Sequence, residues 1–333
     1  MQRVLVVRIG RFGDTIMATP VIEALYQAFG PAVSIDFAAS PGASAYILEL
    51  DSRVNKVFSI AHRSTPWRFH RVKREIEQHS RDFPYDLVIN LECGRECDDF
   101  IKFAHHHEFC GRPLKDTQHR PNRHCVDTEK SIYAEILGPD VTNASDTSLQ
   151  LKLDATDLTA LPDSAYVVIN PGFSGVQRSG YRSHRGWPAA HWQKLIGLLN
   201  GSDGLSVLIN GTHDEQPYFE SLLQLPGVHS LFGSSIPGLA TALLNAKGLI
   251  TVDTGTMHLA MALGTPVLAL FGPSNPELTG PYSSKVSHRV LLSGVDCQPC
   301  INTPAQKQCS YNRCMFGLEP QPVYEACREL FNE

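Results

Sequence analysis

The chain has 333 residues, of which 42% are hydrophobic and 19% charged, and its formal net charge is −5. This composition suits a globular enzyme with two medium-sized domains, and the charge is too small to indicate a nucleic-acid partner. No apolar run approaches the ~20 residues that a membrane-spanning helix needs. The first residues, "MQRVLVVRIGRFGDT", contain arginines within the apolar run and no cleavage-site pattern, so we interpret them as a strand and not as a signal peptide. We therefore expect a cytoplasmic protein with its nine cysteines reduced.

Strand-like and helix-like segments alternate through the first half of the chain. The apolar periods predict strands at 3–9, 32–39, 54–60 and 85–91, and helices at 16–29 and 68–83. Pro20 either kinks the first helix or lies in its early turns. Residues 95–127 have no clear period and are expected to form loops with short helices. The polar, turn-rich stretch 150–165 predicts a boundary between a domain of residues 1–155 and a domain of residues 163–333.

The second half repeats the alternation. It predicts strands at 165–172, 205–211, 248–252 and 266–272, and helices at 188–200, 215–225, 236–246 and 322–332. The last helix belongs to the second domain or packs back on the first. Two α/β halves that each open with an apolar strand and a glycine-rich turn predict two Rossmann-like, doubly wound domains facing across a cleft.

The stretch "TVDTGTMHLAMALGTPVLALFGP" (251–273) has three polar residues, Asp253, Thr254 and His258, at the expected junction of a strand and a helix. Backbone N–H groups at a helix start bind anions, and Gly255 lets a ligand approach the backbone closely. Asp253 accepts from a sugar hydroxyl or simply caps the helix. His258 is a ligand contact or a satisfied core histidine. The combination favours a nucleoside diphosphate site.

A second loop, "RIGRFGDTIMATP" (8–20), is glycine-rich but has only a G-x-x-G pattern and carries an acid, Asp14. A carboxylate at a helix start repels phosphate, so Asp14 either caps the helix or is presented as a general base. A third loop, residues 170–188, contains three arginines, namely Arg178, Arg182 and Arg185. Arginine suits phosphate, and Trp187-Pro188 would hold Arg185 more firmly than the other two.

The "GD" loop, the segment R-x-W-P-x-x-x-W (Arg185 to Trp192) and "DTGTMHLAMALGTPVLALFGP" resemble glycosyltransferase family 9, the ADP-heptose:lipopolysaccharide heptosyltransferases. "GPY" (280–282) and the later cysteines are also similar to members of that family. The resemblance implies a GT-B fold and an inverting, metal-independent sugar transfer without a required cofactor.

The resemblance also implies roles for individual residues. Asp14 takes the general-base position, and Arg185 stands where some relatives have a lysine that binds the donor phosphate. Four residues fall on the donor-binding loop: Asp253, Thr254, Gly255 and His258. A helix N-terminus and an arginine would stabilise the leaving nucleoside diphosphate without a metal.

Two basic stretches, residues 62–74 and 102–124, are either solvated faces or a surface for an anionic, lipid-linked saccharide acceptor at the inner membrane surface. Four cysteines, Cys297, Cys300, Cys309 and Cys314, have a C-x2-C-x8-C-x4-C spacing. They would suit a structural zinc or iron site, with buried free thiols as the alternative. The triplet His105–His107 lacks matching ligands.

We thus predict a heptosyltransferase that uses a nucleotide-sugar donor. A nucleotide-sugar epimerase of the same fold and a non-catalytic nucleotide-sugar binding module are the alternatives. A dehydrogenase is disfavoured because no G-x-G-x-x-G follows either first strand.

Overall fold

The computed structural model describes residues 2–61, 71–92, 103–111, 123–154, 161–173 and 184–331. The chain forms two compact units, Met1–Lys152 and Leu153–Glu333, and each is described here by itself. Part of the expected linker, residues 155–160, lies outside the described ranges.

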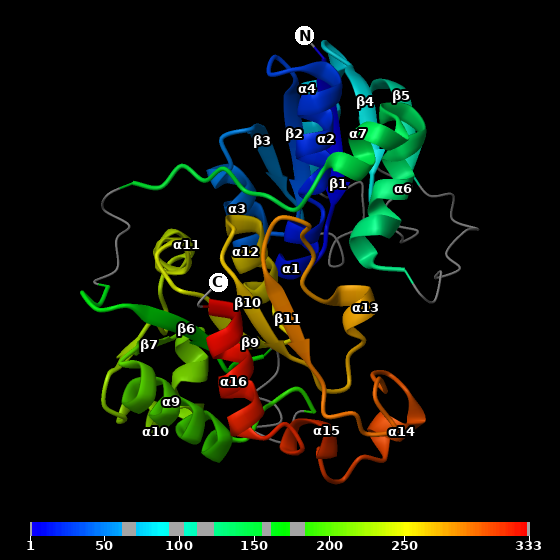
Figure 1. Ribbon diagram of the computed structural model, residues 1–333. Helices are drawn as coiled ribbons and strands as arrows, with labels where there is room; N and C mark the ends of the chain where they lie inside the picture. The colour runs from blue at the N-terminus through cyan, green and yellow to red at the C-terminus, as the bar shows by residue number, and fades with distance from the viewer. Residues whose placement is uncertain are drawn as a thin grey trace. The chain divides into compact units, whose positions relative to one another are not determined.

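The first unit is built on a parallel sheet of five strands in the order β3-β2-β1-β4-β5 (Figure 1). The strands are β1 (Arg3–Arg8), β2 (Ser34–Ala39), β3 (Val54–Ser59), β4 (Tyr85–Asn90) and β5 (His106–Gly111). The helices are α1 (Phe12–Met17), α2 (Pro20–Phe29), α3 (Ala43–Leu50), α4 (Arg71–Arg81), α6 (Cys125–Leu137) and α7 (Pro139–Ala144). The order reverses beside β1, and the carboxyl ends of strands at such a reversal are where open α/β sheets bind ligands.

The helix expected at 16–29 is two helices. Proline has no N–H to donate to the carbonyl of Ile16, so α1 ends at Met17 and Pro20 becomes the first residue of α2. Strand β5 was not expected, because its sequence HHEFCG is polar. It lies at the edge of the sheet, where only Cys110 is buried.

The second unit contains a parallel sheet of six strands in the order β11-β10-β9-β6-β7-β8. The strands are β6 (Tyr166–Asn170), β7 (Ser206–Ile209), β8 (Val228–Ser230), β9 (Leu249–Val252), β10 (Val267–Leu270) and β11 (His288–Leu291). The helical segments are α9 (Ala189–Asp203), η5 (His213–Tyr218), α10 (Glu220–Leu223), α11 (Ile236–Leu244), α12 (Gly255–Leu263), α13 (Pro276–Thr279), α14 (Pro304–Lys307), α15 (Arg313–Phe316) and α16 (Pro320–Phe331).

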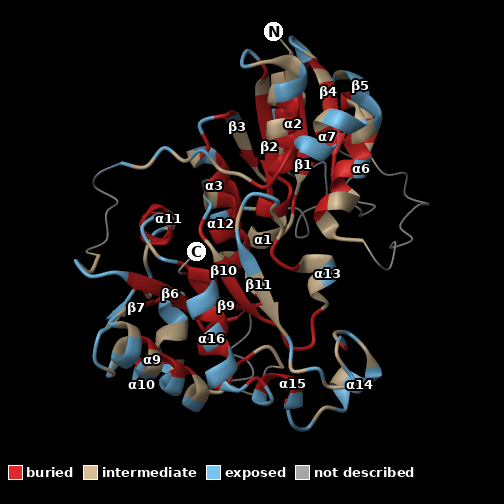
Figure 2. Cartoon of the chain, viewed as in Figure 1, coloured by how far each residue is buried: buried red, intermediate tan, exposed pale blue. Residues whose placement is uncertain are grey.

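The central strands of both sheets are buried on both faces, as Figure 2 shows in red. This explains why they read as continuous apolar runs and not as alternating patterns. Helix α16 packs against α9, β10 and β11 of its own unit, and its apolar face joins the core of that unit. The sequence does not predict β8 and β11, because three or four partly or fully exposed residues give no clear period.

Candidate active site

Asp14 lies at the start of α1, directly after the carboxyl end of β1. Its Oδ2 accepts a hydrogen bond from the backbone N–H of Arg11 at 2.9 Å, which is the reciprocal half of a capping box. A Cβ at Gly10 would lie 2.5 Å from the Asp14 Cβ, so the loop needs glycine there. The Asp14 side chain is 37% exposed. The structure therefore shows the capping contact, and it leaves the carboxylate accessible for a second role.

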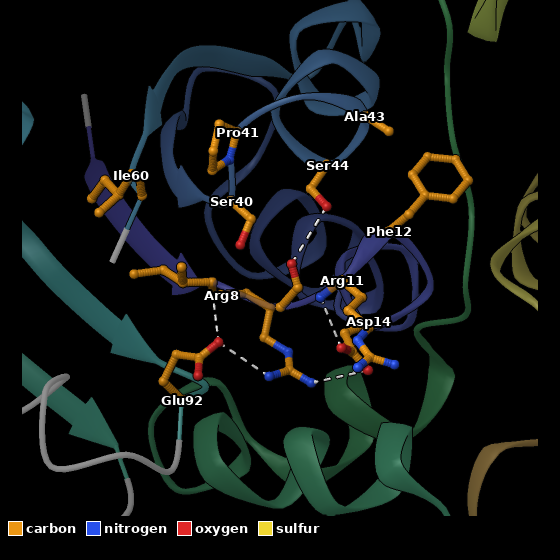
Figure 3. A pocket seen from close by; sticks show the side chains of 13 residues that line it. Arg8, Arg11, Phe12, Asp14, Ser40, Pro41, Ala43, Ser44, Ile60 and Glu92 are labelled. Carbon is orange, nitrogen blue, oxygen red and sulfur yellow. Dashed lines mark hydrogen bonds and ion pairs between the residues drawn. The ribbon is translucent and has the colours of Figure 1, made fainter. Parts of the chain in front are cut away.

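Asp14 lines a cavity of about 780 Å³ in the first unit (Figure 3). The lining comes from the β1–α1 loop, from the segment Ser40–Ser44 at the start of α3, and from the ends of β3 and β4. Its charged members are Arg8, Arg11, Asp14 and Glu92. A cavity of this size, with charged groups at the carboxyl ends of parallel strands, is suited to a polar ligand.

The guanidinium of Arg8 is the centre of a charge cluster beside Asp14. It lies 3.1 Å from Glu92, 3.0 Å from Glu129 and 3.8 Å from Asp14. Burial alone would lower the pKa of Arg8, but the three carboxylates together raise it above its ordinary value. Sequence reasoning missed this cluster, because Glu92 and Glu129 come from distant parts of the chain.

In the second unit, β9 ends at Val252 and α12 begins at Gly255, with Thr254 as its N-cap. The Thr254 hydroxyl does not cap the helix. It pairs with the Thr251 hydroxyl at 3.2 Å and accepts from the Asn170 amide at 3.5 Å. The backbone N–H groups of the first turn of α12 thus have no side-chain cap from Thr254, as an anion site requires.

Asp253 is not the helix cap, so the capping interpretation of this residue is wrong. Its Oδ2 accepts from the Ser274 hydroxyl at 2.6 Å and lies 3.4 Å from the Nε of Arg185. The fold thus brings together Arg185 and Asp253, two of the predicted donor residues. Arg185 remains 29% exposed, so part of its guanidinium is open to solvent.

The sequence predicted that Trp187 would hold Arg185 in place. Trp187 is fully buried, and its indole N–H donates to the carbonyl of Leu318 at 2.8 Å. The Asn312 amide also donates to the carbonyl of Gly186 at 3.3 Å. The backbone that follows Arg185 is therefore anchored in the core. Arg178 and Arg182 lie outside the described residues.

His258, the fourth residue of α12, is 6% exposed and lies in a largely apolar helix. Neither the ligand interpretation nor the core-histidine interpretation is tested by this burial, so its role stays a prediction.

A second cavity, of about 540 Å³, lies at the carboxyl ends of β6, β7 and β9 in the second unit. Thr254 lines it, whereas Arg185, Asp253, Gly255 and His258 are not among its lining residues. Asn170 organises one wall: its Oδ1 accepts from Asn210 at 2.6 Å and from Thr256 at 3.0 Å.

The carboxylate in this second cavity belongs to Glu215, whose Oε2 accepts from the backbone N–H of Thr212 at 2.8 Å. Cβ atoms at Gly172 and Gly211 would lie 2.9 and 3.2 Å from it. The sequence carries a signal for this cavity: an Ile-Asn pair stands at the carboxyl end of both β6 and β7, at or directly after the last strand residue, and glycine follows within two residues, as "INPG" and "INGT".

Comparison with known proteins identifies the family. A family model described as glycosyltransferase family 9 (heptosyltransferase) matches residues 108–311. The chain belongs to this family. It is 28% identical to lipopolysaccharide heptosyltransferase 1 of Pseudomonas aeruginosa, over 97% of this chain and 93% of that protein. It is 27% identical to the Escherichia coli K12 protein of the same name, over 84% of this chain and 91% of that protein.

Solved structures agree with this assignment at the level of the fold. The E. coli heptosyltransferase WaaC with ADP superimposes with a TM-score of 0.71 at 23% identity, covering 98% of this chain and 99% of that one. A family 9 glycosyltransferase from Veillonella parvula gives 0.78 at 18% identity, covering 99% and 97%. The predicted family, the GT-B fold and the glycosyltransferase class are confirmed, and the alternatives of an epimerase and a non-catalytic binding module are set aside.

The structure gives no support for the metal site that the spacing of the four cysteines suggested. Among the described residues, no group of three or more His, Cys, Asp or Glu side chains is arranged to hold a metal ion. Cys309 donates to the carbonyl of Tyr311 and Cys314 to the Asn312 side chain, while Cys297 is exposed. The four thiols nevertheless lie near one another: burial first, and then the charges of neighbouring thiols in this group, raise the pKa values of Cys300 and Cys314. A structural zinc or iron site and free thiols both stay predictions.

Two further expectations concern surfaces. Much of the two basic stretches, namely residues 62–70, residue 102 and residues 112–122, lies outside the described part of the chain. None of the helices that the structure describes is long and apolar enough to cross a bilayer.

Proposed function

We propose that this protein transfers heptose from ADP-heptose to a lipopolysaccharide-core acceptor, with inversion at the anomeric carbon and without a metal ion. The observation that carries the proposal is the accessible carboxylate of Asp14, fixed by a backbone N–H at the rim of a large cavity. The names of the relatives support the choice of sugar and acceptor: two are lipopolysaccharide heptosyltransferases, and one structural neighbour is WaaC with ADP-2-deoxy-2-fluoro heptose.

In this proposal the first unit binds the acceptor. Asp14 accepts the proton of the attacking hydroxyl while the new bond to the anomeric carbon forms. A carboxylate is too weak a base to ionise an alcohol beforehand, so the proton moves during bond formation. The attack displaces ADP from the opposite face of the sugar, which inverts the anomeric centre.

The second unit binds the donor. The first turn of α12 and the open part of the Arg185 guanidinium supply positive charge for the diphosphate. Asp253 holds Arg185 and is itself held by Ser274. The cavity beside Thr254 takes the nucleoside, and the Glu215 carboxylate accepts from ribose hydroxyls. We include Gly255 because its lack of a side chain leaves the backbone open, and His258 because it lies on the same helix.

We further propose that the acceptor is anionic and lipid-linked, so that the enzyme works at the cytoplasmic face of the membrane as a peripheral protein. The lipopolysaccharide acceptors named for the relatives support this location.

The test is a transfer assay with ADP-heptose and heptose-deficient lipopolysaccharide in the presence of EDTA. We expect ADP release and a heptosylated product whose new linkage, read by NMR, has the anomeric configuration opposite to that of the donor. Retention of configuration, or loss of transfer in EDTA with recovery on adding a divalent cation, would contradict the mechanism.

A further inference from the structure

The strongest unexplained feature is a group of three carboxylates around one largely buried arginine. Arg8 is at the end of β1, Glu92 follows β4, Glu129 lies on α6 and Asp14 lies on α1. The Arg8 side chain is 15% exposed, and the side chains of Glu92 and Glu129 are 14% and 8% exposed. Three carboxylates thus share one guanidinium.

The three carboxylates are not equivalent. Nη1 and Nε of Arg8 lie 3.1 and 3.0 Å from Glu92 and Glu129, whereas Nη2 lies 3.8 Å from the Oδ1 of Asp14. Only the contact with Glu92 is a hydrogen bond, whereas the contacts with Glu129 and Asp14 are ion pairs without one. Glu92 and Glu129 are therefore the nearer partners of the guanidinium. Its third edge faces Asp14 at a longer distance, and Figure 3 shows Arg8 between Glu92 and Asp14.

This arrangement divides the two oxygens of Asp14 between two tasks. Oδ2 accepts from the backbone N–H of Arg11, which fixes the carboxylate in the loop. Oδ1 is oriented by the charge of Arg8 but does not accept a hydrogen bond from it. A lone pair on Oδ1 consequently remains for the proton of an acceptor hydroxyl. If Arg8 had no other partners, it would close on Asp14 and occupy that oxygen.

We propose that Arg8 is a positioning residue for the transfer reaction, held by Glu92 and Glu129 so that it orients Asp14 without occupying its basic oxygen. The proposal rests on the proposed role of Asp14 as the base. In the transfer step the acceptor O–H bond breaks, its proton passes to Oδ1, and its oxygen bonds to the anomeric carbon. The bond from that carbon to the diphosphate oxygen breaks, and its electron pair leaves with ADP. Arg8 keeps its protons throughout.

The first test measures kcat and both KM values for Arg8→Lys, alone and combined with Asp14→Asn, with ADP-heptose and heptose-deficient lipopolysaccharide. A lysine keeps the charge but lacks the planar fork that reaches three partners at once. We expect kcat to fall by about 10- to 100-fold, the scale of a 1 Å misplacement, with the donor KM unchanged. In the Asp14→Asn background the same change should alter kcat less than threefold, because the group that Arg8 orients is no longer a base.

Equal losses in both backgrounds, or a loss confined to the acceptor KM, would overturn the proposal, since Arg8 would then act independently of Asp14. If Asp14→Asn alone keeps the wild-type rate, the proposed function fails. Because this result needs no Arg8 variant, it is distinguishable from a failure of the proposal for Arg8.

A second variant covers the case in which Arg8→Lys does not fold. Glu129→Gln has the same shape, does not line the cavity, and removes one of the charges that face Arg8. We expect a severalfold loss of kcat that disappears in the Asp14→Asn background, and an unchanged rate in a folded Glu129→Gln protein would overturn the proposal. Arg53→Lys is the matched control: Arg53 is a buried arginine of the same unit, paired with Asp51 at 2.7 Å, but it does not line the cavity. Its kcat should stay at the wild-type value.

Discussion

Arg185→Ala tests the proposed donor site through the arginine that lies beside Asp253. The guanidinium uses Nε toward Asp253 at 3.4 Å, which leaves most of its five N–H donors for a ligand. Loss of a charge-assisted contact to the diphosphate costs about 1.5–3 kcal/mol, which corresponds to an ADP affinity about 10- to 150-fold weaker. Isothermal titration with ADP measures this loss directly.

The same substitution should change stability little. The ion pair to Asp253 is partly exposed and long, so it is worth less than about 1 kcal/mol. Asp253 also keeps its hydrogen bond from Ser274. The melting temperature should therefore move by no more than about 2–4 °C.

Arg289→Ala is the matched control for this prediction. Arg289 lies on β11 in the same unit, is 41% exposed and pairs with Glu329 on α16. Its removal should leave ADP affinity unchanged. If Arg185→Ala binds ADP within twofold of the wild type, Arg185 does not contact the diphosphate, and the reasoning from its position is refuted.

Two further predictions concern the second unit. A Cβ at Gly172 would lie 2.9 Å from the Glu215 carboxylate, so Gly172→Ala should displace that group and weaken ADP binding at least tenfold, as measured by titration. The control is Gly197→Ala in α9, which has open space around it and should leave ADP affinity unchanged while raising stability by about 0.5–1 kcal/mol. Equal ADP affinities of the two variants would exclude a nucleoside from this cavity. Burial raises the pKa of Cys327 to about 12, so iodoacetamide at pH 8 should label the exposed Cys297 and spare Cys327, as mass spectrometry can show. The Cys327 thiol ionises near pH 9 in the unfolded chain and near pH 12 in the folded one, so the stability that it contributes is fully present below pH 9. That stability is lost between pH 9 and pH 12, at about 1.4 kcal/mol per pH unit. A denaturation midpoint that is constant from pH 8.5 to 10 would contradict this pH dependence.

Where local signals were strong, the sequence predicted the fold and part of the site. β1 and β6 read as continuous apolar runs because their residues are buried on both faces of a parallel sheet. The step from Thr254 to Gly255 was recognisable because a polar residue followed by glycine interrupts an apolar segment where β9 gives way to α12. Such features depend on neighbours in the chain, which a single sequence displays.

The sequence alone did not predict the parts of the site that depend on contacts between residues distant in the chain. Glu92 and Glu129 are ordinary acids in the sequence, and only the pairing of β1 with β4 and the packing of α6 bring them to Arg8. Asp253 looked like a helix cap until the structure placed Ser274 and Arg185 against it. The cysteine spacing was equally ambiguous, because a metal site depends on the directions of four side chains.

The central claim, that Asp14 accepts the proton of the acceptor, is tested most directly by the turnover rate of Asp14→Asn. The asparagine side-chain oxygen can still accept from the N–H of Arg11, so the start of α1 should remain capped and ADP affinity and melting temperature should match the wild type. With saturating ADP-heptose and heptose-deficient lipopolysaccharide, the account predicts a kcat about 100- to 10,000-fold lower. A folded Asp14→Asn protein that transfers heptose within a fewfold of the wild-type rate would contradict it.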